Sequence, residues 1–182
     1  MTAASRTIAS DRRIHVVQGG HGVSADAEVC LTTILGSCVS ACLWDPVAGV
    51  GGMNHFLLPE APDGARDDRR YGVQAMELLV NALLSRGARR ERILAKVFGG
   101  ARMSAAMADI GGRNGVFVKR FLDDENIPLE SASLGGVSAR RIQFWPVTGR
   151  ARQYLVEAGD VPTRERALAR PAPVNGGDLE LF

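Results

Sequence analysis

TTILGSCVSACLWDPVAGVGGMNHFLLP, residues 32–59, sets two cysteines and a histidine among apolar, strand-forming residues. A Gly-Ser pair separates its first two apolar runs and a Gly-Gly pair precedes the histidine, so the stretch predicts short strands joined by turns. Cys42, like Cys30 upstream, lies inside an apolar run, where a free cysteine behaves as a small buried hydrophobe. Cys38 instead follows the Gly36-Ser37 turn, at the mouth of a strand. Cys38 is therefore the candidate nucleophile among the cysteines.

The rest of the chain adds further strands and two helices. Short apolar runs bounded by glycines predict strands at 14–20, 28–35, 39–45, 51–59 and 92–100. Apolar residues recur at helical spacing over 71–88 and 114–127, with Gly87 stopping the first helix and Asn114 capping the second. A hairpin is expected from 140–147 and 150–157. The mixture predicts an α/β or α+β fold, a single-domain layered sandwich with helices packed on a mixed β-sheet.

Length and composition support one domain. The chain has 182 residues, 46% of them hydrophobic, which suffices for one compact core and is too little for two. We expect the folded domain to span 14–157. Residues 1–13 are expected to form a flexible N-terminal segment, and 158–182, rich in Pro, Gly and charge and ending in DLELF, a disordered tail.

Charge and hydropathy bear on two classes of partner, nucleic acids and membranes. A net charge of +2 gives no strong field, so composition alone argues neither for nor against nucleic acid. The paired arginines are not interleaved with aromatics, which favours a solvated surface, and we expect no nucleic-acid partner. The N-terminus lacks the apolar stretch of a secretory signal, and no segment approaches the roughly 18 apolar residues that span a bilayer. We expect a cytoplasmic protein without membrane insertion, and the odd count of 3 cysteines fits free thiols in a reducing compartment.

Two kinds of ligand site are argued against by spacing. The glycine pairs match neither the dinucleotide-binding motif nor the P-loop. The cysteines and histidines include no C-x-x-C or C-x-x-H pair that would chelate zinc. On a strand, Cys38 and Cys42 would share a face but lie about 13 Å apart, too far for one ion. We therefore expect no metal and no organic cofactor.

A cysteine nucleophile needs a base, because an ordinary thiol is only a few per cent thiolate at neutral pH. His55 is the best candidate, although a buried structural histidine produces the same pattern, and His15 and His21 are competitors. The base needs an orienting partner, and Thr32 and Thr33 are the nearby hydroxyls. Only one of them can face the site, because alternate strand residues share a face, and the pattern leaves the choice open.

The surroundings of the thiol supply the remaining candidates. Backbone N–H groups from Ser37 to Val39 are candidate donors to an oxyanion. Gly52 and Gly99, in the glycine pairs, are candidate walls of a substrate groove, because glycine allows a close backbone approach.

Six segments resemble one known family in their order and spacing. They are LGSCVSACLWDP (35–46), GGMNHFLLP (51–59), RYGVQAMELLVNALLSRGA (70–88), AKVFGGARM (95–103), IGGRNGVFVKRFL (110–122) and LGGVSARRIQF (134–144). Together they resemble the chemoreceptor glutamine deamidases of bacterial chemotaxis, the CheD family, over residues 14–157. The GSC motif followed by GGMNHF is the specific part of this pattern.

The resemblance implies a Cys-His-Thr set, with Cys38 as nucleophile, His55 as general acid/base and Thr32 as the residue that orients His55. It also implies a sandwich fold similar to cysteine-dependent toxin deamidases. The implied substrate is a glutamine side chain in the cytoplasmic domain of a methyl-accepting chemotaxis protein. Hydrolysis through a Cys thioester would give glutamate and ammonia. The implied partner, besides the receptor, is a CheC-type phosphatase.

Two other functions are weighed against deamidation. A non-catalytic adaptor would bind a CheC-type phosphatase and would not need Cys38, His55 and Thr32 together. A cysteine peptidase or transglutaminase would cleave or cross-link the receptor instead of deamidating it.

Overall fold

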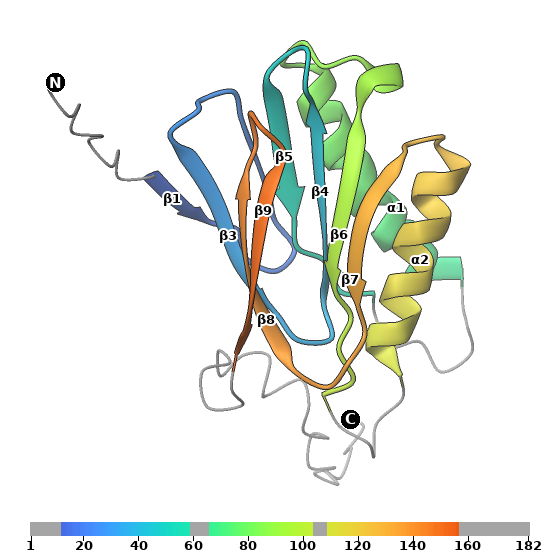
Figure 1. The fold of residues 1–182 in the computed structure, drawn as a ribbon. Helices are drawn as coiled ribbons and strands as arrows, with labels where there is room; N and C mark the ends of the chain where they lie inside the picture. The colour runs from blue at the N-terminus through green and yellow to red at the C-terminus, as the bar shows by residue number, and fades with distance from the viewer. Residues whose placement is uncertain (1–11, 59–65, 104–108, 157–182) are drawn as a thin grey trace, which may run out of the picture.

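Two β-sheets and two helices make up residues 12–58, 66–103 and 109–156, which are the part of the chain that the structure, a computed structural model, describes (Figure 1). The outer sheet has the strand order β1-β3-β8-β9, with β1 (Arg12–His15), β3 (Val29–Leu35), β8 (Ala139–Trp145) and β9 (Arg150–Val156). The inner sheet has the order β2-β5-β4-β6-β7, with β2 (His21–Ser24), β5 (Val50–Asn54), β4 (Val39–Asp45), β6 (Leu94–Gly99) and β7 (Leu129–Leu134). Each sheet contains one parallel pair, β1 with β3 and β6 with β7, so both sheets are mixed.

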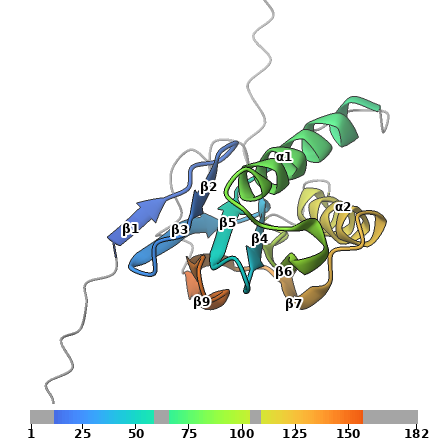
Figure 2. The same cartoon turned by 90° about the horizontal axis from the view of Figure 1, so that it is seen from above.

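The inner sheet lies between the outer sheet and the helices (Figure 2). The helices are α1 (Arg66–Leu84) and α2 (Ile110–Asp124), and a short 3-10 helix spans Arg90–Arg92. Side chains alternate between the two faces of a strand. On β4, Ala41 and Leu43 pack in the cluster that holds the helices, whereas Cys42 and Trp44 belong to the cluster between the two sheets.

Both helices bury the apolar stripe that the sequence predicts. In α1, Met76, Val80 and Leu83 are buried, and the chain leaves the helix just before Gly87. Gly87 has φ +94°, a left-handed conformation that glycine adopts without strain. In α2, Val118 is fully buried against the inner sheet.

The second helix begins one turn earlier than predicted. Its N-cap is Asp109, whose side chain accepts a hydrogen bond from the N–H of Gly112 (2.9 Å). The predicted cap, Asn114, lies inside α2 and is fully buried. Its side chain therefore serves another purpose, described with the site below.

Long-range pairing divides the strands differently from their order in the chain. β3 and β4 are consecutive but lie in different sheets, because β3 pairs with β1 and β8 while β4 pairs with β5 and β6. The connection Gly36–Cys38 therefore crosses from the outer sheet to the inner sheet. Near this crossing, side chains from the outer and the inner sheet pack against one another in the space between the two sheets.

The predicted fold class, an α+β single domain with helices on a mixed sheet, is confirmed. The predicted hairpin is β8–β9. The single sheet of the prediction is wrong in number, since there are two, and β7 was not predicted because its residues are mostly polar and exposed. β1 begins at Arg12, two residues before the predicted boundary, while residues 1–11 and the tail at 158–182 lie outside the described part.

Within the described residues, no helix combines the length and the apolar character needed to cross a membrane.

Candidate active site

Cys38 lies at the crossing between the two sheets. β3 ends at Leu35 and β4 begins at Val39, so a three-residue turn is the whole connection. Cys38 is only 1% exposed and packs in the cluster between the sheets. The predicted position of this cysteine, after a turn and at the mouth of a strand, is confirmed.

The backbone of this turn is fixed by hydrogen bonds to all three of its carbonyls. The Gly36 carbonyl accepts from the N–H of Ala101 (2.8 Å), the Ser37 carbonyl from Nδ2 of Asn114 (2.8 Å) and the Cys38 carbonyl from the N–H of Gly100 (2.7 Å). The donors come from the segment after β6 and from α2. The backbone that carries the thiol is therefore held from two separate elements of the fold.

His55 lies on the same face of the inner sheet as Cys38. Val39 and Phe56 exchange two backbone hydrogen bonds of 2.9 Å, and this register makes Cys38 and His55 diagonal neighbours. Such neighbours lie about 7–8 Å apart at Cα, which long side chains can span. The N–H and C=O of His55 bond to the Gly19-Gly20 turn (3.0 and 2.7 Å), so its backbone is held on both sides.

The imidazole of His55 is oriented by Thr33, from the outer sheet. Nδ1 of His55 and Oγ1 of Thr33 are 2.8 Å apart, and the same Oγ1 lies 2.8 Å from the carbonyl of Val16. Nδ1 itself lies 3.5 Å from the same carbonyl, and both contacts of Oγ1 are satisfied when Thr33 donates to Val16 and Nδ1 donates to Thr33. In that arrangement Nδ1 carries the proton of the neutral ring, and Nε2 has the lone pair that a general base requires.

Thr32, predicted to orient His55, does not do so. Its hydroxyl donates to the carbonyl of Ile142 (2.8 Å), on the neighbouring strand of the outer sheet. Thr33 takes the predicted place because it shares a strand face with Leu31 and Leu35, both buried between the sheets. Those two leucines are the signal in the sequence that could have decided between the threonines.

One of the predicted oxyanion donors, the N–H of Val39, is also wrong. The N–H of Val39 donates to the carbonyl of Phe56 (2.9 Å), as part of the ladder, and points along the sheet. The N–H of Ser37 makes no hydrogen bond within the residues that the structure describes, and Ser37 is half-buried. Ser37 therefore stays a candidate donor.

The two glycines predicted as groove walls have structural tasks instead. Gly52 lies within β5, where a Cβ atom would come within 2.7 Å of Val23 and 2.9 Å of Leu79, so it lets β2 and α1 approach the sheet. Gly99 ends β6 with φ +112°, and a Cβ atom there would collide with the carbonyl of Cys38. The missing side chain at Gly99 thus lets the end of β6 pack directly against the backbone of Cys38.

The remaining thiols and histidines lie in other environments. Cys30 and Cys42 are fully buried, as predicted. Burial raises the pKa of Cys42 to about 12, although hydrogen bonding to Ser40 and the nearby Lys96 act in the opposite direction. His15 and His21 are exposed on β1 and β2. Neither exposed histidine competes with His55 for a place between the sheets.

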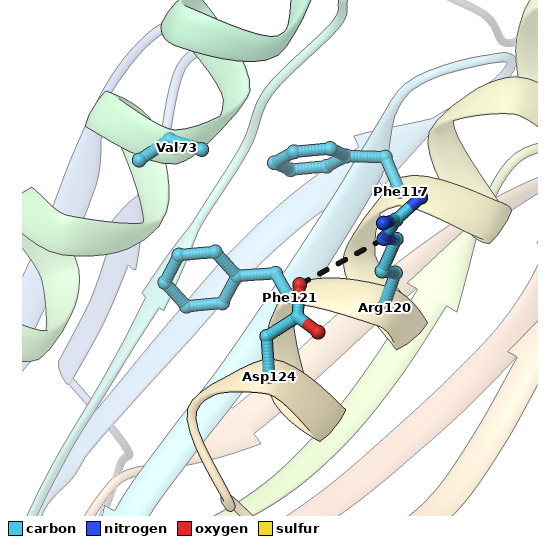
Figure 3. A pocket seen from close by; sticks show the side chains of 5 residues that line it. All are labelled: Val73, Phe117, Arg120, Phe121 and Asp124. Atoms are coloured by element: carbon cyan, nitrogen blue, oxygen red, sulfur yellow. Dashed lines mark ion pairs between the residues drawn. The ribbon is translucent and has the colours of Figure 1, made fainter.

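A surface cavity of about 180 Å³ lies between the helices, on the other face of the inner sheet from Cys38. Figure 3 shows its lining: Val73 from α1, and Phe117, Arg120, Phe121 and Asp124 from α2. Arg120 and Asp124 form an exposed ion pair of 3.8 Å. Among the described residues that line it there is no thiol, hydroxyl or imidazole, so we do not assign the chemistry of Cys38 to this cavity.

Comparison with known proteins agrees with the family expected from the motifs. The model of the family described as CheD chemotactic sensory transduction matches residues 57–154. A protein of Caulobacter vibrioides, named probable chemoreceptor glutamine deamidase CheD, is 54% identical over 177 residues, which cover 93% of each chain. The chain belongs to the CheD family. A CheD of the same name from Rhizobium rhizogenes is 51% identical over 181 residues, covering 96% of this chain and 98% of that one.

Among solved structures, this CheD chain is similar to the Bacillus licheniformis hypothetical protein YfiH, with 12% sequence identity and a TM-score of 0.42. The alignment covers 68% of this chain and 60% of YfiH. The similarity to toxin deamidases stays a prediction.

Proposed function

We propose that this CheD protein is a chemoreceptor glutamine deamidase in which Cys38 is the nucleophile, His55 the general acid/base and Thr33 the residue that orients His55. The observation that carries the proposal is the hydrogen bond between Nδ1 of His55 and the Thr33 hydroxyl. His55 lies on the face of the inner sheet that also carries Cys38. The hydrogen bond supports an imidazole with its basic nitrogen available for proton transfer. The names of the relatives supply the substrate class.

The first half of the reaction forms a thioester. Nε2 of His55 takes the proton of the Cys38 thiol, and the thiolate attacks the side-chain amide carbon of a receptor glutamine. The carbonyl oxygen becomes an oxyanion, to which the turn donates through the Ser37 N–H. The C–N bond then breaks as His55 returns its proton to the leaving nitrogen, which departs as ammonia.

The second half hydrolyses the thioester. His55 takes a proton from water, the resulting hydroxide attacks the thioester carbon, and the C–S bond breaks. The sulfur leaves as the thiolate and recovers its proton from His55. The product is a glutamate side chain, so a neutral amide on the receptor becomes a carboxylate.

Thr33 has a constant role through both halves. Each proton transfer occurs at Nε2, while Nδ1–H keeps donating to the Thr33 hydroxyl, which itself donates to Val16. This chain fixes the ring and stabilises the imidazolium that forms.

Ammonia release tests the proposal. Purified protein is incubated with the cytoplasmic fragment of a methyl-accepting chemotaxis protein, ammonia is measured, and receptor peptides are analysed by mass spectrometry. We expect glutamine-to-glutamate conversion by the unchanged protein and by Cys42→Ala, and none by Cys38→Ala. Cys42 is the matched control, because it is a buried cysteine on the same strand face.

Other outcomes would contradict deamidation. A cleaved or cross-linked receptor would indicate a peptidase or transglutaminase. Binding of a CheC-type phosphatase by a protein that releases no ammonia would indicate the adaptor. Equal ammonia release by Cys38→Ala would exclude the proposed nucleophile.

A further inference from the structure

Asn114 joins the two segments that carry the candidate nucleophile and base. It lies in α2, is 0% exposed, and uses both ends of its side-chain amide. Nδ2 donates to the carbonyl of Ser37 (2.8 Å), the residue before Cys38. Oδ1 accepts from the N–H of Leu58 (3.0 Å), in the segment that follows His55.

The chemistry of the two partners fixes the orientation of this amide. The Ser37 carbonyl can only accept and the Leu58 N–H can only donate, so Nδ2 and Oδ1 cannot be exchanged. Both bonds are buried, where an unmade hydrogen bond is costly. The turn and the segment after His55 are therefore held at a set separation by one side chain.

The bond to Ser37 also aims the peptide group next to the thiol. In a trans peptide the carbonyl and the N–H of the next residue point in opposite directions. Since the Ser37 carbonyl points to α2, the N–H of Cys38 is directed away from that helix. A rotation of this peptide would move both the thiol and the N–H groups of the turn.

We propose that Asn114 is a positioning residue that holds the Cys38 turn in register with His55. In the deamidation reaction, on whose assignment this part of the proposal rests, it acts through the backbone and touches no reacting atom. Only a side chain with a donor and an acceptor at amide spacing satisfies both partners. Asparagine supplies them in a single planar group.

The test compares Asn114→Asp with Val118→Ala. The aspartate side chain has the same size and keeps an acceptor for Leu58, but it sets a second oxygen against the Ser37 carbonyl. Val118 is one turn further along α2 and also 0% exposed, so its truncation weakens the packing of the same helix without touching the turn. Asn114→Ala, which removes both bonds without adding charge, carries the test if the aspartate variant does not fold.

Two readouts are needed for each variant. The first is the rate of Cys38 alkylation by iodoacetamide as a function of pH. The second is kcat and KM for ammonia release from the receptor fragment. For the Asn114 variants we expect the pH profile of alkylation to move to higher pH and kcat to fall about 100-fold, as for a misplacement of about 1 Å, with little change in KM. Val118→Ala should lower the melting temperature and leave both readouts unchanged.

The outcomes separate this proposal from the proposed function. An alkylation profile that stays in place in the Asn114 variants would overturn the positioning role, as would equal losses in Val118→Ala. A shifted profile together with no ammonia release from the unchanged protein would support the positioning of Cys38 and refute the deamidase.

Discussion

The two ends of β4 hold buried polar groups in opposite ways. At its C-terminal end, the carboxylate of Asp45 is itself the centre of the hydrogen bonds. It accepts from the N–H groups of Val47 (2.9 Å), Ala48 (3.0 Å) and Arg89 (2.9 Å), and from Nε of Arg92 (2.9 Å). Burial disfavours the charged carboxylate, but these hydrogen bonds outweigh it and lower the pKa of Asp45 to about 2.

At the N-terminal end, the hydrogen bonds hold the backbone around Cys38. The carbonyls of the turn are fixed from β6 and α2, and the side chain that is oriented by hydrogen bonds is His55. Asp45 is thus stabilised in one charge state, whereas at the other end the backbone of Cys38 and the ring of His55, its proposed base, are held in place. The difference fits a structural role for Asp45 at one end of the strand and the proposed reactive role of Cys38 at the other.

Cys42, between the two ends, shows that residue type alone does not decide whether a cysteine can act as a nucleophile. It faces the same cluster as Cys38 but is enclosed in the sheet, where burial raises the pKa of its thiol to about 12. A thiol in that environment stays protonated at neutral pH and is a poor nucleophile.

Removal of the Thr33 hydroxyl has the largest expected effect on activity. Thr33→Val keeps the shape but removes the acceptor for Nδ1–H, so the imidazole can turn or change tautomer. We expect kcat for ammonia release to fall about 10- to 100-fold, as for loss of the partner that orients a metal-ligating histidine. Thr32→Val, which loses only the bond to the Ile142 carbonyl, is the matched control and should keep nearly full activity. Equal losses in the two variants would contradict the assignment of Thr33.

Asp45→Asn should have the smaller effect on activity and act on stability instead. The variant weakens the bonds of a fully buried carboxylate and its ion pair with Arg92 (2.8 Å), so we expect a loss of about 1–3 kcal/mol in the free energy of unfolding. Urea unfolding measures this loss, and kcat at a temperature where the variant is folded should be unchanged.

The pH dependence provides a second check on Asp45. Its folded pKa is lowered, so its contribution is fully present above the ordinary carboxyl pKa near 4 and is lost as pH falls toward about 2. The stability of the unchanged protein should decline over this range, and Asp45→Asn should lack that part of the decline. An identical acid limb in both proteins would show that Asp45 is not the structural charge described here.

Much of the reactive end could be predicted from local sequence. The Gly36-Ser37 turn marked Cys38, and the alternation around His55 placed it on one strand face. The choice between Thr32 and Thr33 was missed because it depends on which strand face meets the other sheet. Leu31 and Leu35, at alternate positions on either side of Thr33, mark that face in the sequence.

The role of Asn114 was missed for a related reason. An asparagine near the start of a helical pattern predicts an N-cap. Asn114 instead lies inside α2, one turn before Val118 and on the same buried face. A polar residue on a buried face needs partners. The sequence could have indicated that need, but the partners, Ser37 and Leu58, lie in segments that only the tertiary fold brings to α2.

Mapping the alkylation of all three cysteines tests the central claim most directly. Iodoacetamide carries the same carboxamide group as a glutamine side chain, and mass spectrometry of digested protein locates and times each modification. We predict that Cys38 reacts first, that Cys30 and Cys42 stay unmodified in the folded protein, and that His55→Gln slows the reaction at Cys38. Reaction at Cys42 as fast as at Cys38, or a Cys38 rate unchanged by His55→Gln, would contradict a thiol activated by His55.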